Sequence, residues 1–230
     1  GYYYNDEYLV SWAFGHLFTL ADIEDYQDDP SDKRWKMDNL PCFPENFKFT
    51  LKKDDKKEID KGVLKQFNIL SDLCNREDVT EIVNAGDADR EGEVIVRLII
   101  QNALKSEKKL TRLWLPDQTS ETIVSELKEK KEESEYNNLA NEGFARTYID
   151  WLYGVNLTRF ATLKTGVLLR VGRVIIPIVK AIYDRDMAIR NFQPTIYYGL
   201  ISKEKTSDEV IELNSKEKFD KDDLTKAEEL

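Results

Sequence analysis

The first half of the chain alternates strand-like segments with helix-like ones. Strands are predicted where β-branched and aromatic residues cluster or where apolar and polar residues alternate, and helices where apolar residues recur every three to four positions. A region rich in Asp, Pro and Ser at residues 23–44 predicts a long surface loop. The predicted strands are 8–13, 47–52, 80–85 and 110–115, and the predicted helices are 64–73 and 93–104. Strands alternating with helices predict an α/β layer with a largely parallel sheet.

The pattern changes after Pro116, where helical periodicity continues without strands for a long stretch. Helices are predicted at residues 119–133, 137–163 and 174–190, followed by a strand at 197–201 and a polar tail at 203–230. These segments predict three domains. They are an α/β domain over residues 1–115, a mainly helical domain over residues 116–195, and the truncated start of a further domain over residues 196–230.

The formal net charge of -10 argues against a nucleic-acid partner until its distribution is considered. Residues 151–183 contain no Asp or Glu, although the whole chain has 44 acidic residues. Five basic residues lie in this segment: Arg159, Lys164, Arg170, Arg173 and Lys180. The segregation predicts one basic surface on an acidic protein. The alternative is a buried helical segment that merely excludes acids.

Other sequence features narrow the class of protein. No apolar run approaches the roughly 20 residues that span a bilayer, and the first residues lack the pattern of a signal peptide. We therefore expect a cytoplasmic protein with no membrane partner. Cys42 and Cys74 have neither a C-x-x-C spacing nor a nearby histidine, so a zinc site or a disulfide framework has little support.

The strongest chemical signal is a cluster of four acids, Asp87, Asp89, Glu91 and Glu93, between a predicted strand and the next helix. Open α/β folds place ligands at this edge of the sheet. Carboxylate oxygens without His or Cys favour magnesium or calcium, and we expect Asp87, Asp89 and Glu91 to hold Mg²⁺. An EF-hand loop is disfavoured because Leu98 stands where that loop needs a bidentate Glu. Acids also favour helix starts for purely structural reasons, but four in seven residues repel one another.

The acidic segment 87–93 resembles the D-x-D-R-E-G-E motif of TOPRIM domains, which topoisomerases, primases and some nucleases share. Four further segments resemble motifs of type IA DNA topoisomerases, in the same order over residues 8–192, and the nearest likeness is to bacterial topoisomerase III. These segments are W-A-F-G-H-L at 12–17, R-L-W-L at 112–115, D-W-L-Y-G-V-N-L-T-R at 150–159, and V-G-R-V-I-I-P at 171–177.

This resemblance implies an enzyme whose tyrosine attacks a DNA phosphodiester, forms a 5′-phosphotyrosine, and allows another strand to pass before resealing. Magnesium at the acidic cluster would position the phosphates, and single-stranded DNA would lie along the helical part, with no small-molecule cofactor. The family's first-strand Glu and Lys and its Y-P-R-T tyrosine have no counterpart in this sequence, so the chain alone is expected to be inactive. Ile175 replaces the usual Gln, and residues 117–119 depart from the usual serine-rich turn.

Seven residues are predicted DNA contacts: His16, Asn156, Thr158, Arg159, Lys164, Arg170 and Arg173. Arg173 directly precedes a predicted helix, whose free backbone N–H groups could bind the same phosphate. Arg159 continues an apolar stripe of its helix, so a buried ion pair with an acid is an alternative role. A lone histidine such as His16 is more often structural than catalytic, and we expect a phosphate or sugar contact.

Two other functions remain open at this stage. A TOPRIM nuclease or a primase-type phosphoryl-transfer domain would use the same acids without a tyrosine. It would not explain why segment 150–159 has the D-W-x-x-G-x-N-x-T-R pattern. A noncatalytic module that binds single-stranded DNA would use the basic segment alone, and would bind equally well without magnesium or the aspartates.

Overall fold

The computed structural model describes residues 1–220, which form two compact units. The first unit is Gly1–Ile176, and the second begins at Pro177. The predicted boundary between residues 115 and 116 lies inside the first unit and is not a break in its packing. No helix of the described residues is long and apolar enough to cross a membrane.

The strands of the first unit are short and mostly antiparallel. β1 (Tyr2–Tyr4) pairs with β2 (Leu9–Ser11), and β3 (Phe18–Leu20) pairs with β4 (Phe49–Leu51), both antiparallel. β5 (Glu81–Asn84) pairs in parallel with β6 (Lys109–Arg112), whose other edge carries the antiparallel β7 (Lys131–Glu132).

The predicted largely parallel sheet is therefore not found among the described residues, where β5–β6 is the one parallel pair. A parallel neighbour needs a long crossover, and α2 supplies it between these two strands. Sequence patterns located β2, β4, β5 and β6 but missed β1, β3 and β7. β1 consists of three tyrosines and β7 of Lys131 and Glu132, so neither shows an alternation of apolar and polar residues. β3 has the same sequence, Phe-Thr-Leu, as the predicted β4 and was overlooked.

Five helices were predicted close to their observed bounds: α1 (Lys61–Cys74), α2 (Arg90–Ala103), α3 (Ser120–Glu129), α4 (Asn137–Thr165) and α5 (Ile175–Arg190). Three short 3-10 helices were not predicted: η1 (Ile23–Tyr26), η2 (Met37–Asn39) and η3 (Glu133–Tyr136). Local chemistry explains the main boundaries. The Asp60 carboxylate caps α1 by accepting from the N–H groups of Gly62 and Val63, and Gly166 ends α4 with φ of 73°.

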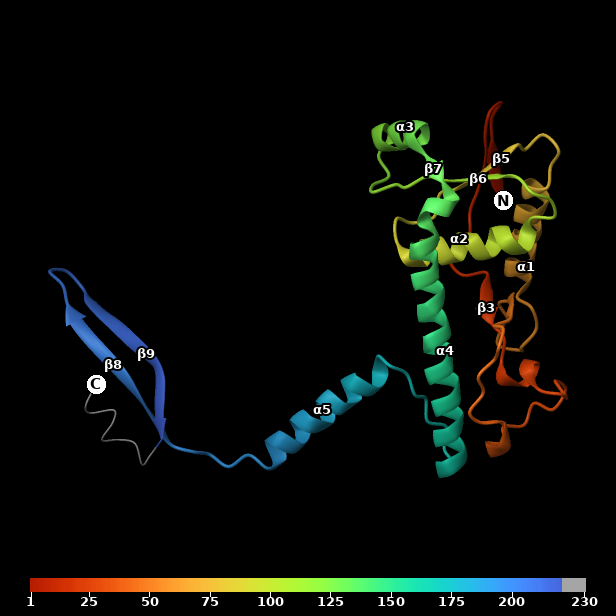
Figure 1. Cartoon of the computed structure of the whole chain (residues 1–230). Coiled ribbons are helices and arrows are strands. Elements are labelled where there is room, and N and C mark those ends of the chain that lie inside the picture. Colours follow the sequence, from red (N-terminus) through yellow and green to blue (C-terminus); the bar gives the residue numbers. More distant parts are fainter. Residues whose placement is uncertain (221–230) are drawn as a thin grey trace. The chain divides into compact units, whose positions relative to one another are not determined.

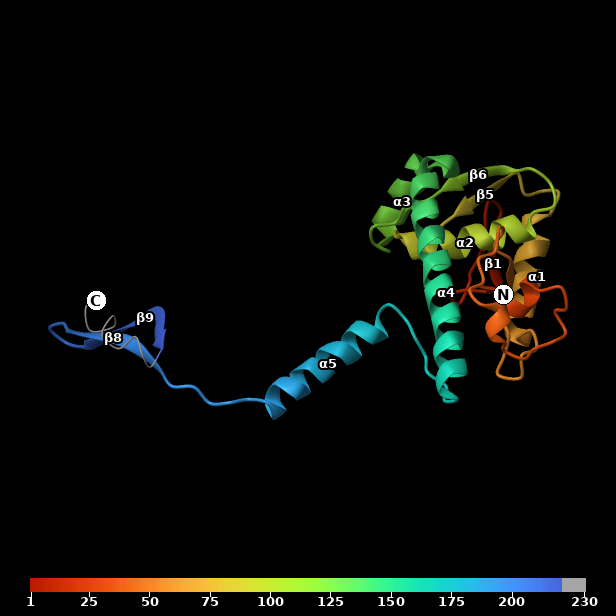
Figure 2. The ribbon, with the colours of Figure 1, turned by 60° about the horizontal axis from the view of Figure 1, so that its bottom comes forward.

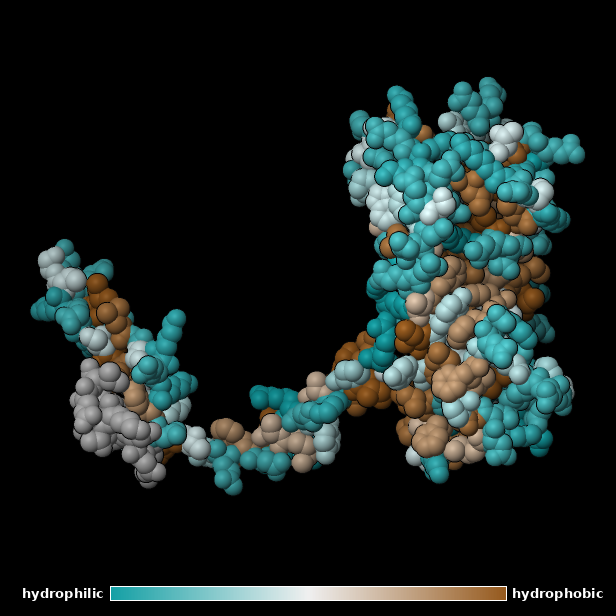
Figure 3. Space-filling view, viewed as in Figure 1, coloured by the Kyte–Doolittle hydropathy of each residue, from teal (hydrophilic) through white to brown (hydrophobic). Residues whose placement is uncertain are grey.

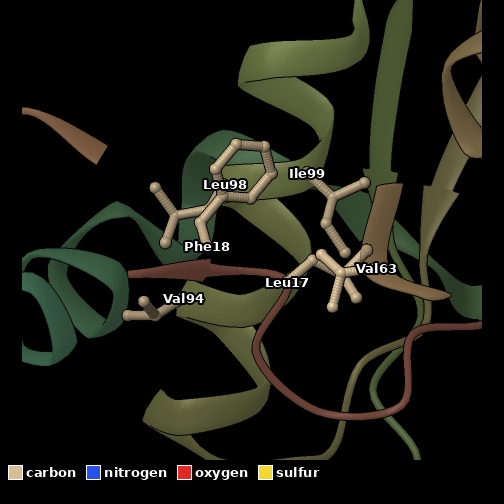
Figure 4. Close-up of a cluster of buried hydrophobic side chains, with 6 residues drawn as sticks. All are labelled: Leu17, Phe18, Val63, Val94, Leu98 and Ile99. Carbon is tan, nitrogen blue, oxygen red and sulfur yellow. The ribbon is translucent and has the colours of Figure 1, made fainter. Parts of the chain in front are cut away.

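The core of the first unit forms around α2, which packs against α1, α4 and β3 and lies between α1 and α4 in Figures 1 and 2. Figure 4 shows its buried centre, which consists of Leu17, Phe18, Val63, Val94, Leu98 and Ile99. α2 and α4 approach closely at Gly143, where an added Cβ would lie 2.5 Å from a methyl group of Val94. The core thus holds the start of α2 in a fixed position beside α4.

The surface of the first unit is less polar toward the end of α4 (Figure 3). Large apolar side chains are exposed there and just beyond it: Leu157, Phe160, Val167, Leu168 and Leu169. The basic segment predicted from the sequence therefore carries an apolar surface as well as cations.

The described part of the second unit contains most of α5 and a β-hairpin. The hairpin pairs β8 (Tyr197–Lys205) with β9 (Val210–Asp220) in antiparallel register, with an irregularity between Gly199 and Ile201. The sequence predicted the start of β8 but assigned β9 to a polar tail, because most residues from 203 onward are polar. The remainder of that predicted tail, residues 221–230, lies outside the described residues.

Candidate functional site

The acidic turn, residues 85–89, connects the end of β5 to the start of α2. The Asp89 carboxylate caps α2 by accepting from the Gly92 N–H at 2.7 Å. The turn lies directly against the first turn of the helix, because an added Cβ on Gly92 would be 2.5 Å from the backbone N and O of Asp87. Asp87 and Asp89 are exposed, so both carboxylates can be reached from solvent.

Beneath the acidic turn lies Arg112, the last residue of β6, which is completely buried. Its Nη2 donates to the Asp87 carbonyl at 2.7 Å. Its Nη1 donates to the carbonyls of Gly86 at 2.8 Å and Asn84 at 3.2 Å. A buried cation thus binds three backbone carbonyls, two in the turn and one at the strand end before it.

The fourth acid of the cluster has a different environment from the other three. Glu93 is completely buried and bridges two arginines, accepting from Arg112 Nε at 2.7 Å and from Arg97 Nε at 2.6 Å. Burial raises the pKa of the nearby Glu133, an effect that Arg97 opposes. Glu93 therefore belongs to a buried ion-pair network below the turn.

The described residues contain no group of three or more His, Cys, Asp or Glu side chains arranged to hold a metal ion. The predicted set of Asp87, Asp89 and Glu91 is thus not brought together as a cage. Instead, the Glu91 carboxylate lies 2.7 Å from Nε2 of His16, which comes from the segment before β3. The structure leaves Asp87 and Asp89 as the exposed carboxylates of the turn itself.

A cleft of about 380 Å³ opens beside this His16–Glu91 pair. Its walls come from β3, β4, α2 and α4, and the residues that line it include Lys52, Asp150 and Trp151. The cleft therefore extends from Glu91, in the first turn of α2, to Asp150 and Trp151 at the start of segment 150–159.

Segment 150–159 attaches the long loop after β3 to α4. Trp151 Nε1 donates to the Ala21 carbonyl at 3.0 Å. The Asn156 amide binds Cys42 twice, accepting from its N–H at 2.7 Å and donating to its carbonyl at 3.0 Å. Arg159 forms a two-pronged buried ion pair with Glu24, at 2.9 and 2.7 Å, and its guanidinium lies 4.9 Å from the Trp35 ring centre.

These contacts give three of the predicted DNA contacts a role inside the protein. Arg159 is 5% exposed and paired with an acid, which is the alternative that the sequence left open. Thr158 Oγ1 exchanges hydrogen bonds with the backbone of Val171, at 2.9 and 3.3 Å. Asn156 is likewise buried.

Three other predicted contacts remain at the surface. Lys164, Arg170 and Arg173 are exposed, as a DNA-binding role requires. Arg173 pairs with Asp150, whose carboxylate raises the pKa of the arginine. Because this pair is exposed to solvent, a DNA phosphate could replace Asp150 at modest cost.

Comparison with known proteins adds to this geometry. Residues 3–127 match the Toprim domain family, and residues 134–230 match a family described as DNA topoisomerase. DNA topoisomerase 3 of Bacillus cereus strain ATCC 14579 is 39% identical over 200 residues, which cover 87% of this chain. DNA topoisomerase 3 of Bacillus subtilis strain 168 is 38% identical over the same length.

The chain belongs to the type IA DNA topoisomerase family. The predicted family is thus confirmed, and so is its likeness to the bacterial topoisomerase III kind. The chain spans about a quarter of the length of these relatives, 26% in each case. In this topoisomerase family member, the Toprim match contains the acidic turn and Arg112, and the second match contains α4, α5 and the hairpin.

Arg112 is a functional residue that the sequence predicted only as part of the R-L-W-L motif, without its buried place below the turn. A signal was available, because Arg112 interrupts the predicted strand 110–115, whose other members are mostly apolar. A charged residue in a buried strand needs a partner. Glu93 was available as that partner, because it was the one acid of segment 87–93 that had not been assigned to the magnesium site.

Proposed function

We propose that this chain forms the acidic-turn part and the adjoining helical part of a type IA DNA topoisomerase. The complete enzyme would cut one DNA strand through a tyrosine outside residues 1–230, pass another strand through the gap, and reseal it. One observation carries the proposal: the first part of the chain matches the Toprim family and the second part matches the DNA topoisomerase family. Asp87 and Asp89 are also exposed at the turn, where they could reach a substrate. A nuclease or primase would not account for the second match.

Magnesium is the cofactor that fits the exposed carboxylates. Mg²⁺ in phosphoryl-transfer sites is usually held by one or two carboxylates, water and substrate phosphates. Asp87 and Asp89 fit this arrangement, whereas Glu91 is occupied by His16. When bound there, the ion would neutralise phosphate charge during cleavage and resealing. The chain's own residues would keep the two carboxylates at the turn and hold His16 beside Glu91.

A segment exchange tests the proposed activity. The part of this chain that matches the Bacillus cereus DNA topoisomerase 3 would replace the corresponding segment of that enzyme, and relaxation of negatively supercoiled DNA would be measured. We expect the chimera to relax DNA, and Asp87→Asn together with Asp89→Asn to reduce its rate at least a hundredfold. The matched control is Asp28→Asn, an exposed loop acid. A folded chimera that binds DNA and never relaxes it would contradict the proposal.

Single-stranded DNA is the proposed partner, bound through Arg173, Lys164 and Arg170, with His16 at the cleft. The exposure of the three basic side chains supports this proposal, because they can contact phosphates without any change in the core. Asn156, Thr158 and Arg159 would help only by holding the loop after β3 and the backbone of Val171 against α4. The net negative charge does not prevent this, because acids beyond the Debye length of about 8 Å are largely screened at physiological salt.

Arg173→Ala should weaken binding of a short single-stranded oligonucleotide several-fold and lower the salt dependence by about one phosphate contact. Fluorescence anisotropy at several salt concentrations measures both effects. Lys180→Ala is the matched control, because Lys180 pairs with Asp184 within α5 and lies well after the helix start. Equal effects of the two substitutions would contradict a specific role for Arg173.

A further inference from the structure

We propose that Arg112 is the positioning residue of the acidic turn, and that its guanidinium sets where Asp87 and Asp89 stand. This inference deepens the proposed function, since the turn is the proposed magnesium site. It rests on the arrangement of buried contacts below the turn, which the family motif alone does not explain.

Backbone geometry provides the first step. The Asp87 carbonyl accepts two hydrogen bonds, from Arg112 Nη2 at 2.7 Å and from the Asp89 N–H at 2.8 Å. The second bond ties the two aspartates together across Ala88. Arg112 therefore holds the atom on which the spacing of the two carboxylates depends.

Charge provides the second step. Two exposed aspartates separated by one residue repel each other, and a buried cation directly below their backbone offsets part of this repulsion. Glu93 accepts from Arg112 on the opposite side, at 2.7 Å, and also from Arg97 at 2.6 Å, so one buried carboxylate is shared between two cations. The rings of Trp114 and Tyr136 lie 5.0 and 5.8 Å from the guanidinium carbon and restrict its movement.

A lysine could not replace this arginine. The guanidinium reaches Glu93 through Nε while its two Nη atoms reach the turn, a fork that a single ammonium group does not have. Arg112→Lys should keep the charge and lose the fixed geometry.

Arg97 offers a matched control. It is also buried and also bonds to Glu93, but its other donors go to Asn137 and the Glu133 carbonyl, away from the turn. Arg97→Lys should therefore disturb the same ion-pair network and leave the turn in place.

Amide hydrogen exchange on the full chain tests the positioning role. In Arg112→Lys we expect protection at Asp89 and Gly92 to fall at least tenfold, while protection at Ile99 and Ile100 in the same helix changes little. Arg97→Lys should leave Asp89 and Gly92 protected. A uniform loss of protection in both variants would overturn the proposal, because it would mean that Arg112 only stabilises the fold. If Arg112→Lys does not fold, Trp114→Leu is the second variant. It keeps Arg112 but removes the ring beside the guanidinium, so that water competes for the carbonyls of Gly86 and Asp87. Protection at Asp89 and Gly92 should again fall while protection at Ile99 and Ile100 changes little.

A second readout separates this inference from the proposed function. Mn²⁺, used as a probe for Mg²⁺, should broaden the amide NMR signals of Asp87 and Asp89 in the unmutated chain, and this selectivity should be lost in Arg112→Lys but kept in Arg97→Lys. If the unmutated chain shows no selective broadening while the exchange result holds, the proposed metal site fails and the positioning role stands. Selective broadening that persists in Arg112→Lys would overturn the inference.

Discussion

Replacing Arg159 with alanine should lower the free energy of unfolding by about 3–5 kcal/mol, because Glu24 would be left as a buried, unpaired carboxylate. Both partners are almost fully buried, at 5% and 3% exposure. DNA binding by the folded variant should change little, since Arg159 is 5% exposed and its guanidinium faces Glu24 inside the protein. Denaturant unfolding and anisotropy with a single-stranded oligonucleotide measure the two effects separately.

Lys164→Ala is the matched control for Arg159→Ala, because Lys164 is an exposed cation on the same helix. It should change the free energy of unfolding by no more than about 0.5 kcal/mol. A double variant, Glu24→Gln with Arg159→Met, should recover much of the lost stability, because it removes both charges together. If Arg159→Ala kept normal stability but lost DNA binding, Arg159 would be a DNA contact and not a structural residue.

Gly92→Ala should destabilise the protein by about 1–3 kcal/mol and displace the acidic turn. An alanine Cβ at this position would lie 2.5 Å from two backbone atoms of Asp87 and 2.9 Å from its Cα. Backbone cannot give way as a flexible side chain does, so the turn and the helix must separate. Thermal unfolding measures the stability change, and Mn²⁺ broadening at Asp87 measures the displacement.

Gly154 provides a control of opposite sign. It also lies within a helix, but the nearest atom to an added Cβ, the Val171 carbonyl oxygen, is 3.7 Å away. Gly154→Ala should therefore stabilise the protein by about 0.4–1 kcal/mol through the lower flexibility of the unfolded chain. Destabilisation by both substitutions would show that the lack of space for a Cβ does not explain the effect at Gly92.

The sequence predicted the helices well because each has a strong local signal. Leu64, Phe67, Leu70 and Leu73 recur at helical spacing in α1, for example. The strands were located less completely, since β2 and β4 were predicted and β1, β3 and β7 were not. The largely parallel sheet was therefore inferred from the alternation of elements, and the antiparallel partners of β2 and β4 were not foreseen.

The sequence predicted where the candidate site lies, but not which side chains pair with one another there. Residue types placed the acids at the edge of a strand, as observed. They could not reveal that Glu93 turns inward, that Glu91 meets His16, or that Arg159 meets Glu24 from 135 residues earlier in the chain. Such pairings depend on long-range folding, which no local pattern encodes.

The three attachments of α4 to the loop after β3 have a consequence for recognition. Trp151, Asn156 and Arg159 hold residues 21, 42 and 24 in place through contacts within the protein. Trp151 also lines the cleft. A ligand that enters the cleft would meet this side chain already fixed by its bond to Ala21, and would not have to supply the entropy of ordering it. Association should then be limited by encounter and charge, with a rate that falls as salt rises but does not level off at high ligand concentration.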